Sequence, residues 1–238
     1  MGGSSINCRP VRSLVEIQAF QGKAGRMAKR KSDASPREAK RARTRTRLTE
    51  AALRLMAQRG INGTSVSEIA AEAELANGTF YLYFRDKTEI VAAVCQAVTL
   101  AMHNEMNSIR LSLEDGSARV AFGTQQFIEI AAAEPSWGRL LMSAFTEFEA
   151  IKDDISRYMR LDVALGIEQG CFTETINEFL IDSLLAILRA GVSSRLDGNE
   201  ADVGARAAEY HLRILGMSAA DARRVRLATE LAAERRSN

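Results

Sequence analysis

The stretch from Thr64 to Ile90 reads TSVSEIAAEAELANGTFYLYFRDKTEI, and it decides the fold of the chain. Ser65 stands three residues before Glu68, which is the spacing of a capping box and predicts that a helix begins there. A short break over residues 74–76 then separates this helix from a very short one expected over residues 77–84. The stretch therefore predicts two short helices joined by a tight turn.

A longer helix is expected on each side of this pair. Upstream, between Arg37 and Arg59, the apolar residues follow the spacing i, i+3, i+4, i+7 and i+8 from Leu48, which is one face of an amphipathic helix. Downstream, Asp86 and Glu89 repeat the capping spacing, and they predict a helix from residue 87 to about residue 111.

The rest of the chain also predicts helices and contains no strand-like alternation of any length. The composition agrees, because 46% of the residues are apolar and only three are proline. Breaks at glycines and capping residues place the further helices at about 120–133, from Pro135 onward, 153–168, 173–195, 202–215 and after Ser218.

Two helices that meet at a very short turn, after a longer amphipathic helix, form a helix-turn-helix, whose second helix enters the major groove of DNA. The segments TSVSEIA, NGTFYLYF and DKTE resemble the signature of the TetR family, and the resemblance covers about residues 40–100. It implies an all-α fold with a three-helix DNA-binding domain and a larger C-terminal helical domain for ligand binding and dimerisation. The predicted boundaries are 1–36 for a basic extension, 37–85 and 86–238.

The predicted reading helix carries residues suited to base edges. Asn77 can donate and accept toward adenine, although an asparagine here could instead be the N-cap of the helix. Thr79 could contact a base or a thymine methyl group. Gly78, like Thr79, adds little bulk, so that the backbone could approach DNA closely.

Other residues are expected to bind phosphate. The resemblance implies that Tyr81 bonds a phosphate, that Tyr83 lies at the DNA surface unless it packs inside, and that Lys87 binds phosphate at a helix start. Two helix N-termini, near residues 65 and 87, would favour the same anion. The remaining predicted contacts, to phosphate or in part to bases, are Ser65, Ser67, Arg43, Arg45 and Arg47.

Charge divides the chain unequally. Residues 1–50 hold 13 Lys and Arg against 4 Asp and Glu, whereas residues 51–238 hold 19 against 26. A basic end suits a polyanion, but a solvated tail explains it equally well, and the same two interpretations apply to Lys29, Arg30 and Lys31. Residues 1–26 are expected to be disordered, as an upstream start or added sequence.

The resemblance also implies a homodimer, formed by helices near 173–195 and 202–215, that binds a palindromic site on double-stranded DNA. It further implies repression that a small hydrophobic molecule relieves. A ligand-independent DNA-binding protein or an activator of the same fold is the alternative. One candidate pocket residue is His103, although a surface histidine is the favoured interpretation there. The other candidates, for each of which a place in the core is the favoured interpretation, are Phe122, Phe127, Trp137, Leu141, Phe145, Tyr158, Met159 and Phe172.

Other functions find little support in the sequence. Its three cysteines and two histidines lack the spacing of a disulfide framework or metal site, so no metal or cofactor is expected and a reducing cytoplasm is indicated. An enzyme is disfavoured because no catalytic Ser/His/Asp set or phosphate loop is present. No apolar run approaches the ~18 residues of a membrane span, and no secretory signal is expected at residues 1–26.

Overall fold

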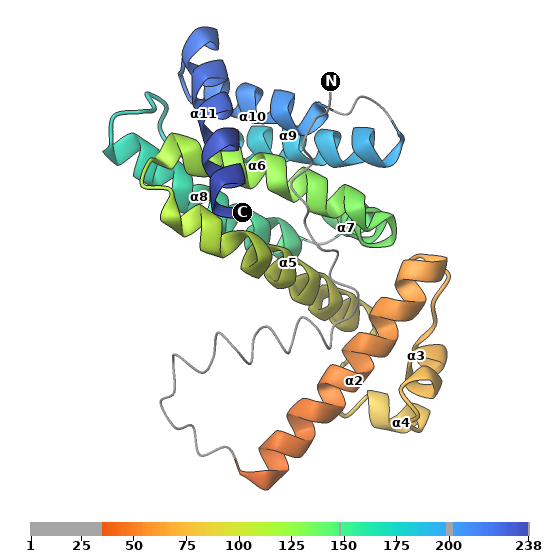
Figure 1. The fold of residues 1–238 in the computed structure, drawn as a ribbon. Coiled ribbons are helices and arrows are strands. Elements are labelled where there is room, and N and C mark those ends of the chain that lie inside the picture. The colour runs from red at the N-terminus through yellow and green to blue at the C-terminus, as the bar shows by residue number, and fades with distance from the viewer. Residues whose placement is uncertain (1–34, 148, 199–201, 238) are drawn as a thin grey trace. The chain divides into compact units, whose positions relative to one another are not determined.

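The computed structural model describes residues 35–147, 149–198 and 202–237, and all the secondary structure in these ranges is helical, which confirms the predicted all-α class (Figure 1). The helices are α2 (Pro36–Arg59), α3 (Val66–Glu72), α4 (Asn77–Phe80), α5 (Lys87–Ser112), α6 (Gly116–Ala133), α7 (Pro135–Glu147), α8 (Glu149–Glu168), α9 (Glu178–Leu196), α10 (Val203–Ile214) and α11 (Ala219–Ser237).

The described chain forms two compact units, which divide between Ala97 and Val98. The division falls inside α5, so one continuous helix begins in the smaller unit and ends in the larger one. The predicted domain boundary, between residues 85 and 86, lies at the start of this same helix.

The smaller unit begins at a well-capped helix. Ser35 and Glu38 form a capping box, in which the Ser35 side chain accepts from the Glu38 backbone and the Glu38 carboxylate accepts from the Ser35 backbone at 2.8 Å. Pro36 occupies the first turn, where its missing N–H costs nothing. The helix therefore starts inside the extension predicted for residues 1–36, and the expectations for residues 1–34 lie outside the described residues.

The core of the smaller unit gathers the apolar faces of α2, α3 and α4. Its largest fully buried side chains include Leu48, Met56, Ile69, Phe80 and Phe84. The first two come from α2 and repeat at the predicted helical spacing, whereas the aromatic pair comes from α4 and the turn after it. Because a unit this small has little apolar surface to bury, each of these large side chains contributes a sizeable part of its core.

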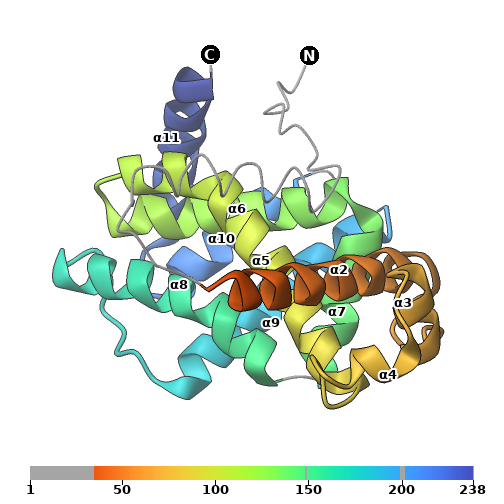
Figure 2. The ribbon, with the colours of Figure 1, turned by 90° about the horizontal axis from the view of Figure 1, so that it is seen from below.

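The larger unit is built around α6, which contacts α8, α9, α10 and α11 (Figure 2). Eleven of the eighteen residues of α6 are buried, which explains why its sequence is apolar on more than one face. The helix predicted from residue 173 begins later, at Glu178, because the side chain of Asn177 accepts from the Leu180 backbone at 2.9 Å and caps it there.

Within the described ranges, no helix combines the length and apolarity that crossing a bilayer requires. The same residues contain no group of three or more His, Cys, Asp or Glu side chains placed to hold a metal ion. Cys95 is buried and Cys171 is half-buried, and both are free thiols.

A buried histidine joins three helices of the larger unit. His211 on α10 is fully buried, with Nδ1 2.7 Å from the Thr124 hydroxyl on α6 and Nε2 2.8 Å from the carbonyl oxygen of Leu184 on α9. A carbonyl can only accept, so Nε2 carries the proton. Burial lowers the pKa of His211 to about 4, although the hydrogen bond to Leu184 acts in the opposite direction.

This histidine makes stability depend on pH. The unfolded chain binds a proton at His211 near pH 6.5 and the folded chain only near pH 4, so its contribution is complete above pH 6.5 and is lost as the pH falls through this window. We expect His211 to account for about 2 kcal/mol of lost unfolding free energy between pH 7 and pH 5. Urea unfolding of wild type and His211→Gln at both pH values measures this, and equal pH slopes in the two proteins would contradict the assignment.

Candidate functional site

The turn between α3 and α4 is closed by its own backbone. The amide of Leu75 donates to the carbonyl of Ala70, and the amide of Glu74 donates to the carbonyl of Ala71, both at 2.9 Å. This is the Schellman arrangement, which needs a left-handed residue after the helix, and Glu74 supplies it with φ of 54°. Because such a conformation is costly for a residue other than glycine, the surroundings must hold it in place.

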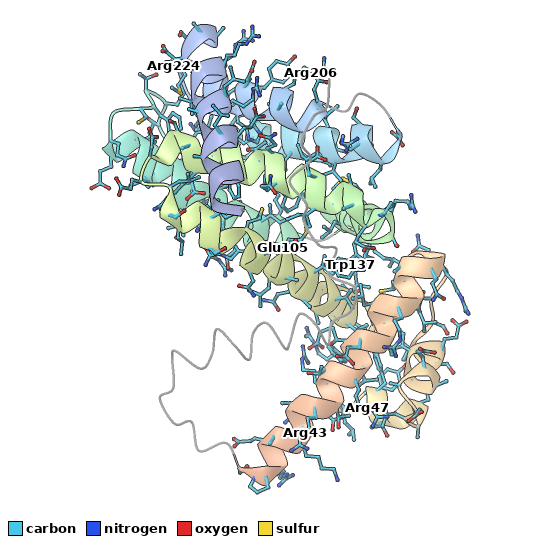
Figure 3. The ribbon with its side chains drawn as sticks, viewed as in Figure 1. Arg43, Arg47, Glu105, Trp137, Arg206 and Arg224 are labelled. Carbon is cyan, nitrogen blue, oxygen red and sulfur yellow. The ribbon has the colours of Figure 1, made fainter. Side chains whose placement is uncertain are left out.

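Arg47 provides that support. Its guanidinium donates to the carbonyl of Ala73 at 2.6 Å and approaches the Glu74 carboxylate at 3.4 Å. The side chain therefore clamps the turn from α2, on which Arg43 and Arg47 both lie (Figure 3). Its predicted role in phosphate binding stays a prediction, and the structure adds a role within the fold.

Arg45 similarly holds the segment that follows α4. Its guanidinium donates to the Tyr83 carbonyl at 2.8 Å, lies over the Phe84 ring at 4.1 Å from the centroid and stands 3.9 Å from the Glu89 carboxylate. A cation above an aromatic face is attracted by the ring quadrupole. Arg43 is likewise exposed on α2, and its predicted phosphate contact stays a prediction.

The short helix α4 ends sooner than the sequence suggested. Regular α-helix covers Asn77–Phe80, and the amides of Leu82 and Tyr83 then donate to carbonyls three residues earlier, so the predicted helical segment to residue 84 continues as tight turns. Phe80 and Phe84 anchor the segment because both rings are buried, with their centroids 5.6 Å apart.

The other side of α4 is exposed. Asn77, Gly78 and Tyr81 are all exposed, and Asn77 and Tyr81 stand four residues apart on one helical face. Thr79 and Tyr83 are half-buried. The N-cap of α4 is Ala76, which makes no side-chain capping hydrogen bond. Asn77 is therefore not the cap, and the alternative role given to it was wrong.

The two predicted anion-binding helix ends differ. At α3, the hydroxyl of Ser65 and its backbone amide both pair with the Glu68 carboxylate, which already occupies this helix end. At α5, Asp86 accepts from the Glu89 backbone at 2.8 Å, and Lys87 is half-buried at the first position. Ser67 is exposed on α3.

The larger unit contains a cavity of about 70 Å³ within its helical bundle. Each of three helices contributes one face at intervals of three and four residues, which is the spacing of side chains stacked along a helix. The lining residues are Thr99, His103, Met106 and Arg110 on α5, Arg119, Val120, Gly123, Thr124 and Phe127 on α6, Ile155, Tyr158, Met159 and Asp162 on α8, and Leu188 on α9.

Four of the nine candidate pocket residues line this cavity, namely His103, Phe127, Tyr158 and Met159. The others do not line it, and they are Phe122, Trp137, Leu141, Phe145 and Phe172. Phe122 and Leu141 are buried core, and Phe172 packs against Gly166. Trp137 lies on α7, whose residues take no part in the lining (Figure 3). Helical spacing from His103 would have found Thr99, Met106 and Arg110.

The polar groups of the cavity are unusually buried. Arg110 on α5 forms an ion pair with Asp162 on α8, and both side chains are 7% exposed. The His103 ring stacks on the Tyr158 ring with centroids 3.4 Å apart. Burial, followed by the charge of Arg110, lowers the pKa of His103 to about 4, so this histidine is uncharged at neutral pH. His103 is buried, and the expectation of a surface histidine was wrong.

Known sequences match only a limited part of the chain. The family described as bacterial regulatory proteins, tetR family, matches residues 48–94. The uncharacterized HTH-type transcriptional regulator YuxN of Bacillus subtilis (strain 168) is 45% identical over 47 residues, which is 20% of this chain and 16% of YuxN. YerO of the same organism is 31% identical over 67 residues, covering 28% and 23% respectively. The chain thus matches less than a quarter of the length of either relative.

Solved structures match a larger part of the chain. RolR in complex with resorcinol superposes with a TM-score of 0.66 at 26% identity, covering 79% of this chain and 95% of RolR. The fatty acid degradation regulator FadR from Bacillus halodurans matches at a TM-score of 0.57 and 20% identity, covering 73% of this chain and 98% of FadR, which shows a shared fold.

A capped helix-turn-helix followed by a larger helical bundle defines the class of helix-turn-helix transcriptional regulators. Within that class, residues 48–94 match the tetR family, and the chain shares its two-part fold with RolR.

Proposed function

We propose that this protein is a homodimeric repressor that binds a palindromic operator and leaves it when a small hydrophobic molecule binds the larger unit. The observation that carries the proposal is the exposed face of α4, where Asn77, Gly78 and Tyr81 stand on a buried base of Phe80 and Phe84. A polar face held rigidly outward by a core is what a reading helix needs to enter a groove.

The small size of Gly78 supports contact with DNA. Its φ is not left-handed, and a Cβ placed on it would meet no atom within 4 Å, so neither backbone conformation nor packing within the fold requires glycine here. Close approach of a groove wall would require it. Asn77, on the same turn, has the paired donor and acceptor that suit an adenine edge.

A second copy would supply the matching half-site. Phe179 on α9 is 82% exposed, and Tyr210 and Ile214 on α10 are 49% and 36% exposed. In contrast, Leu180, Leu184, Leu188 and Leu212 on the same helices are buried in the larger unit, so the two helices carry apolar groups on both sides. Large exposed apolar side chains favour burial against a partner, and α9 and α10 are the helices for which the sequence predicted a dimer.

The cavity in the larger unit supports a response to a ligand. Four of its lining residues belong to α5, the helix that begins with Lys87 in the smaller unit. A ligand that binds more tightly when α5 is in the DNA-incompetent arrangement would shift the protein away from DNA. RolR, which has the same fold, was solved with resorcinol, and resorcinol is therefore the first compound to test for release.

Substitutions on the DNA-facing surface should separate positioning from reading. We expect Tyr81→Ala and Lys87→Ala to weaken binding to all duplexes, because phosphate contacts carry no sequence information. Asn77→Ala should instead relax the preference at one base of each half-site, by about 1–3 kcal/mol. Selection of bound genomic fragments identifies the operator, and binding curves on that operator and on its single-base variants measure both effects.

Arg139→Ala is the matched control, because Arg139 is exposed on α7. This substitution removes one positive charge, as Lys87→Ala does. A Lys87→Ala protein with unchanged affinity at moderate salt would show that the start of α5 does not lie on phosphate. A wild-type protein that remains monomeric and does not bind duplex DNA would disprove the proposed function as a whole.

A further inference from the structure

An exposed leucine stands on the same segment as the predicted DNA contacts. Leu82 is 70% exposed, and among the described residues of the smaller unit, 35–97, the large apolar side chains that are exposed are those of Tyr81 and Leu82. A single exposed leucine is ordinary on a protein surface, so its position on the fold decides whether it has a role.

Leu82 lies on the side of the segment that faces away from the core. The amides of Leu82 and Tyr83 donate to carbonyls three residues earlier, at 3.2 Å and 2.9 Å, so the chain keeps turning in a helical sense after α4. In such a turn, residues two positions apart do not face the same way. Phe80 and Phe84, two positions before and after Leu82, are both buried, so Leu82 occupies the outermost point of the segment.

The surface next to Leu82 is open. Gly78 stands four positions earlier, on the same side of the helical turn, and it has no side chain that would cover the leucine. A Cβ placed on Gly78 would meet no atom within 4 Å. A small apolar group therefore has room to reach the Leu82 side chain across the backbone of Gly78 without displacing any part of the smaller unit.

The groups around Leu82 indicate that this apolar group belongs to DNA. Asn77 and Tyr81 are exposed beside it, and the Arg85 side chain, which pairs with Glu89 at 3.2 Å, is still 87% exposed. The centre of a protein interface is depleted of such charged residues, whereas a cation suits the phosphates that border a groove. The apolar group that bases present in the major groove is the C5-methyl group of thymine.

These observations assign a partner to the leucine. Resting on the proposed function as a DNA-binding regulator, we propose that Leu82 contacts the C5-methyl group of one thymine in each half-site and so distinguishes thymine from the same base without its methyl group. Burial of one methyl group is worth about fourfold in affinity, and two half-sites together give about fifteenfold.

Deoxyuridine tests the proposal, because it lacks only the methyl group of thymidine and keeps the same base pairing. In the operator selected from genomic fragments, each recurrent thymine is replaced in both half-sites, and fluorescence anisotropy measures binding at fixed salt. Wild type should lose about fifteenfold in affinity at one position and little at the others. Leu82→Ala should bind the natural operator at least as weakly as wild type binds the substituted one. Deoxyuridine at that position should then cost this variant less than about threefold.

Two further variants and the salt dependence show that the contact is specific. Leu161→Ala is the matched control, because Leu161 is 58% exposed on α8, and it should keep both the affinity and the deoxyuridine effect of wild type. Leu82→Met keeps a large apolar side chain and should retain part of that effect. Since no phosphate contact is lost, Leu82→Ala should keep the wild-type dependence of affinity on salt, whereas Lys87→Ala should reduce it.

Three results would overturn the proposal and leave the proposed function in place, because in each of them the protein still binds its operator. These are selected half-sites without a recurrent thymine, a wild-type protein that is indifferent to every deoxyuridine, and an equal deoxyuridine loss in wild type and Leu82→Ala. A wild-type protein that binds no duplex at all would disprove both the proposed function and the thymine contact.

Discussion

Arg110→Ala is expected to destabilise the larger unit by about 3–5 kcal/mol, because it leaves the Asp162 carboxylate buried with its main partner removed. Burial already raises the pKa of Asp162, and the charge of Arg110 acts against that rise. Without Arg110 the carboxyl group would therefore take up a proton at higher pH. Unfolding followed by the fluorescence of Trp137, the single tryptophan of the chain, measures the effect in the larger unit.

Two further variants show that burial causes this loss. Arg160 on α8 pairs with Glu178 at 2.6 Å, but the Glu178 side chain is 82% exposed, so Arg160→Ala should cost no more than about 1 kcal/mol. Combining Arg110→Met with Asp162→Leu removes both charges and should restore much of the stability. If the double variant were as unstable as Arg110→Ala, lost packing and not the unpaired charge would explain the result.

Phe80→Ala should destabilise the smaller unit by about 3–5 kcal/mol, since the ring is fully buried and its removal leaves a cavity. The ring contacts Phe84 and lies edge-on to Tyr81, with the Phe80 and Tyr81 centroids 5.3 Å apart. A loss of this size is a large share of the stability of so small a unit, so α4 would lose its support and operator binding would fall with it.

Two optical signals separate the units in this experiment. Far-ultraviolet circular dichroism follows all helices, whereas the fluorescence of Trp137 follows the larger unit. In Phe80→Ala, the part of the unfolding transition that comes from the smaller unit should move to lower denaturant concentration in the dichroism signal. The transition followed by fluorescence should not move. Leu82→Ala is the control, because Leu82 is 70% exposed and its loss should change stability by less than about 0.5 kcal/mol. Equal shifts in these two variants would contradict the assignment of Phe80 to the core.

The predicted helix starts were accurate where a side chain determines them. Ser65 with Glu68 and Asp86 before α5 act through bonds that span three residues, so their geometry is local and can be recognised in the sequence. The helix start predicted at residue 173 was wrong. A cap determines this start too, but the capping residue is Asn177, and the sequence offered several polar candidates for it.

The sites were harder to predict than the helices. Arg45 and Arg47 are basic residues near a predicted DNA surface, and nothing in the sequence indicated that they donate to the backbone of Tyr83 and Ala73. Five aromatic or apolar pocket candidates proved not to line the cavity, because large apolar side chains fill a core as readily as they line a pocket.

The amino-acid order alone determined the helix-turn-helix, the helical class and the division of charge, because capping bonds and helical periodicity operate over three to eight residues. Only the tertiary structure decided which polar groups meet. Arg110 and Asp162 are 52 positions apart, and Thr124 and His211 are 87 positions apart. Their pairing follows from how four helices pack, and packing of distant faces leaves no periodic signal in the sequence.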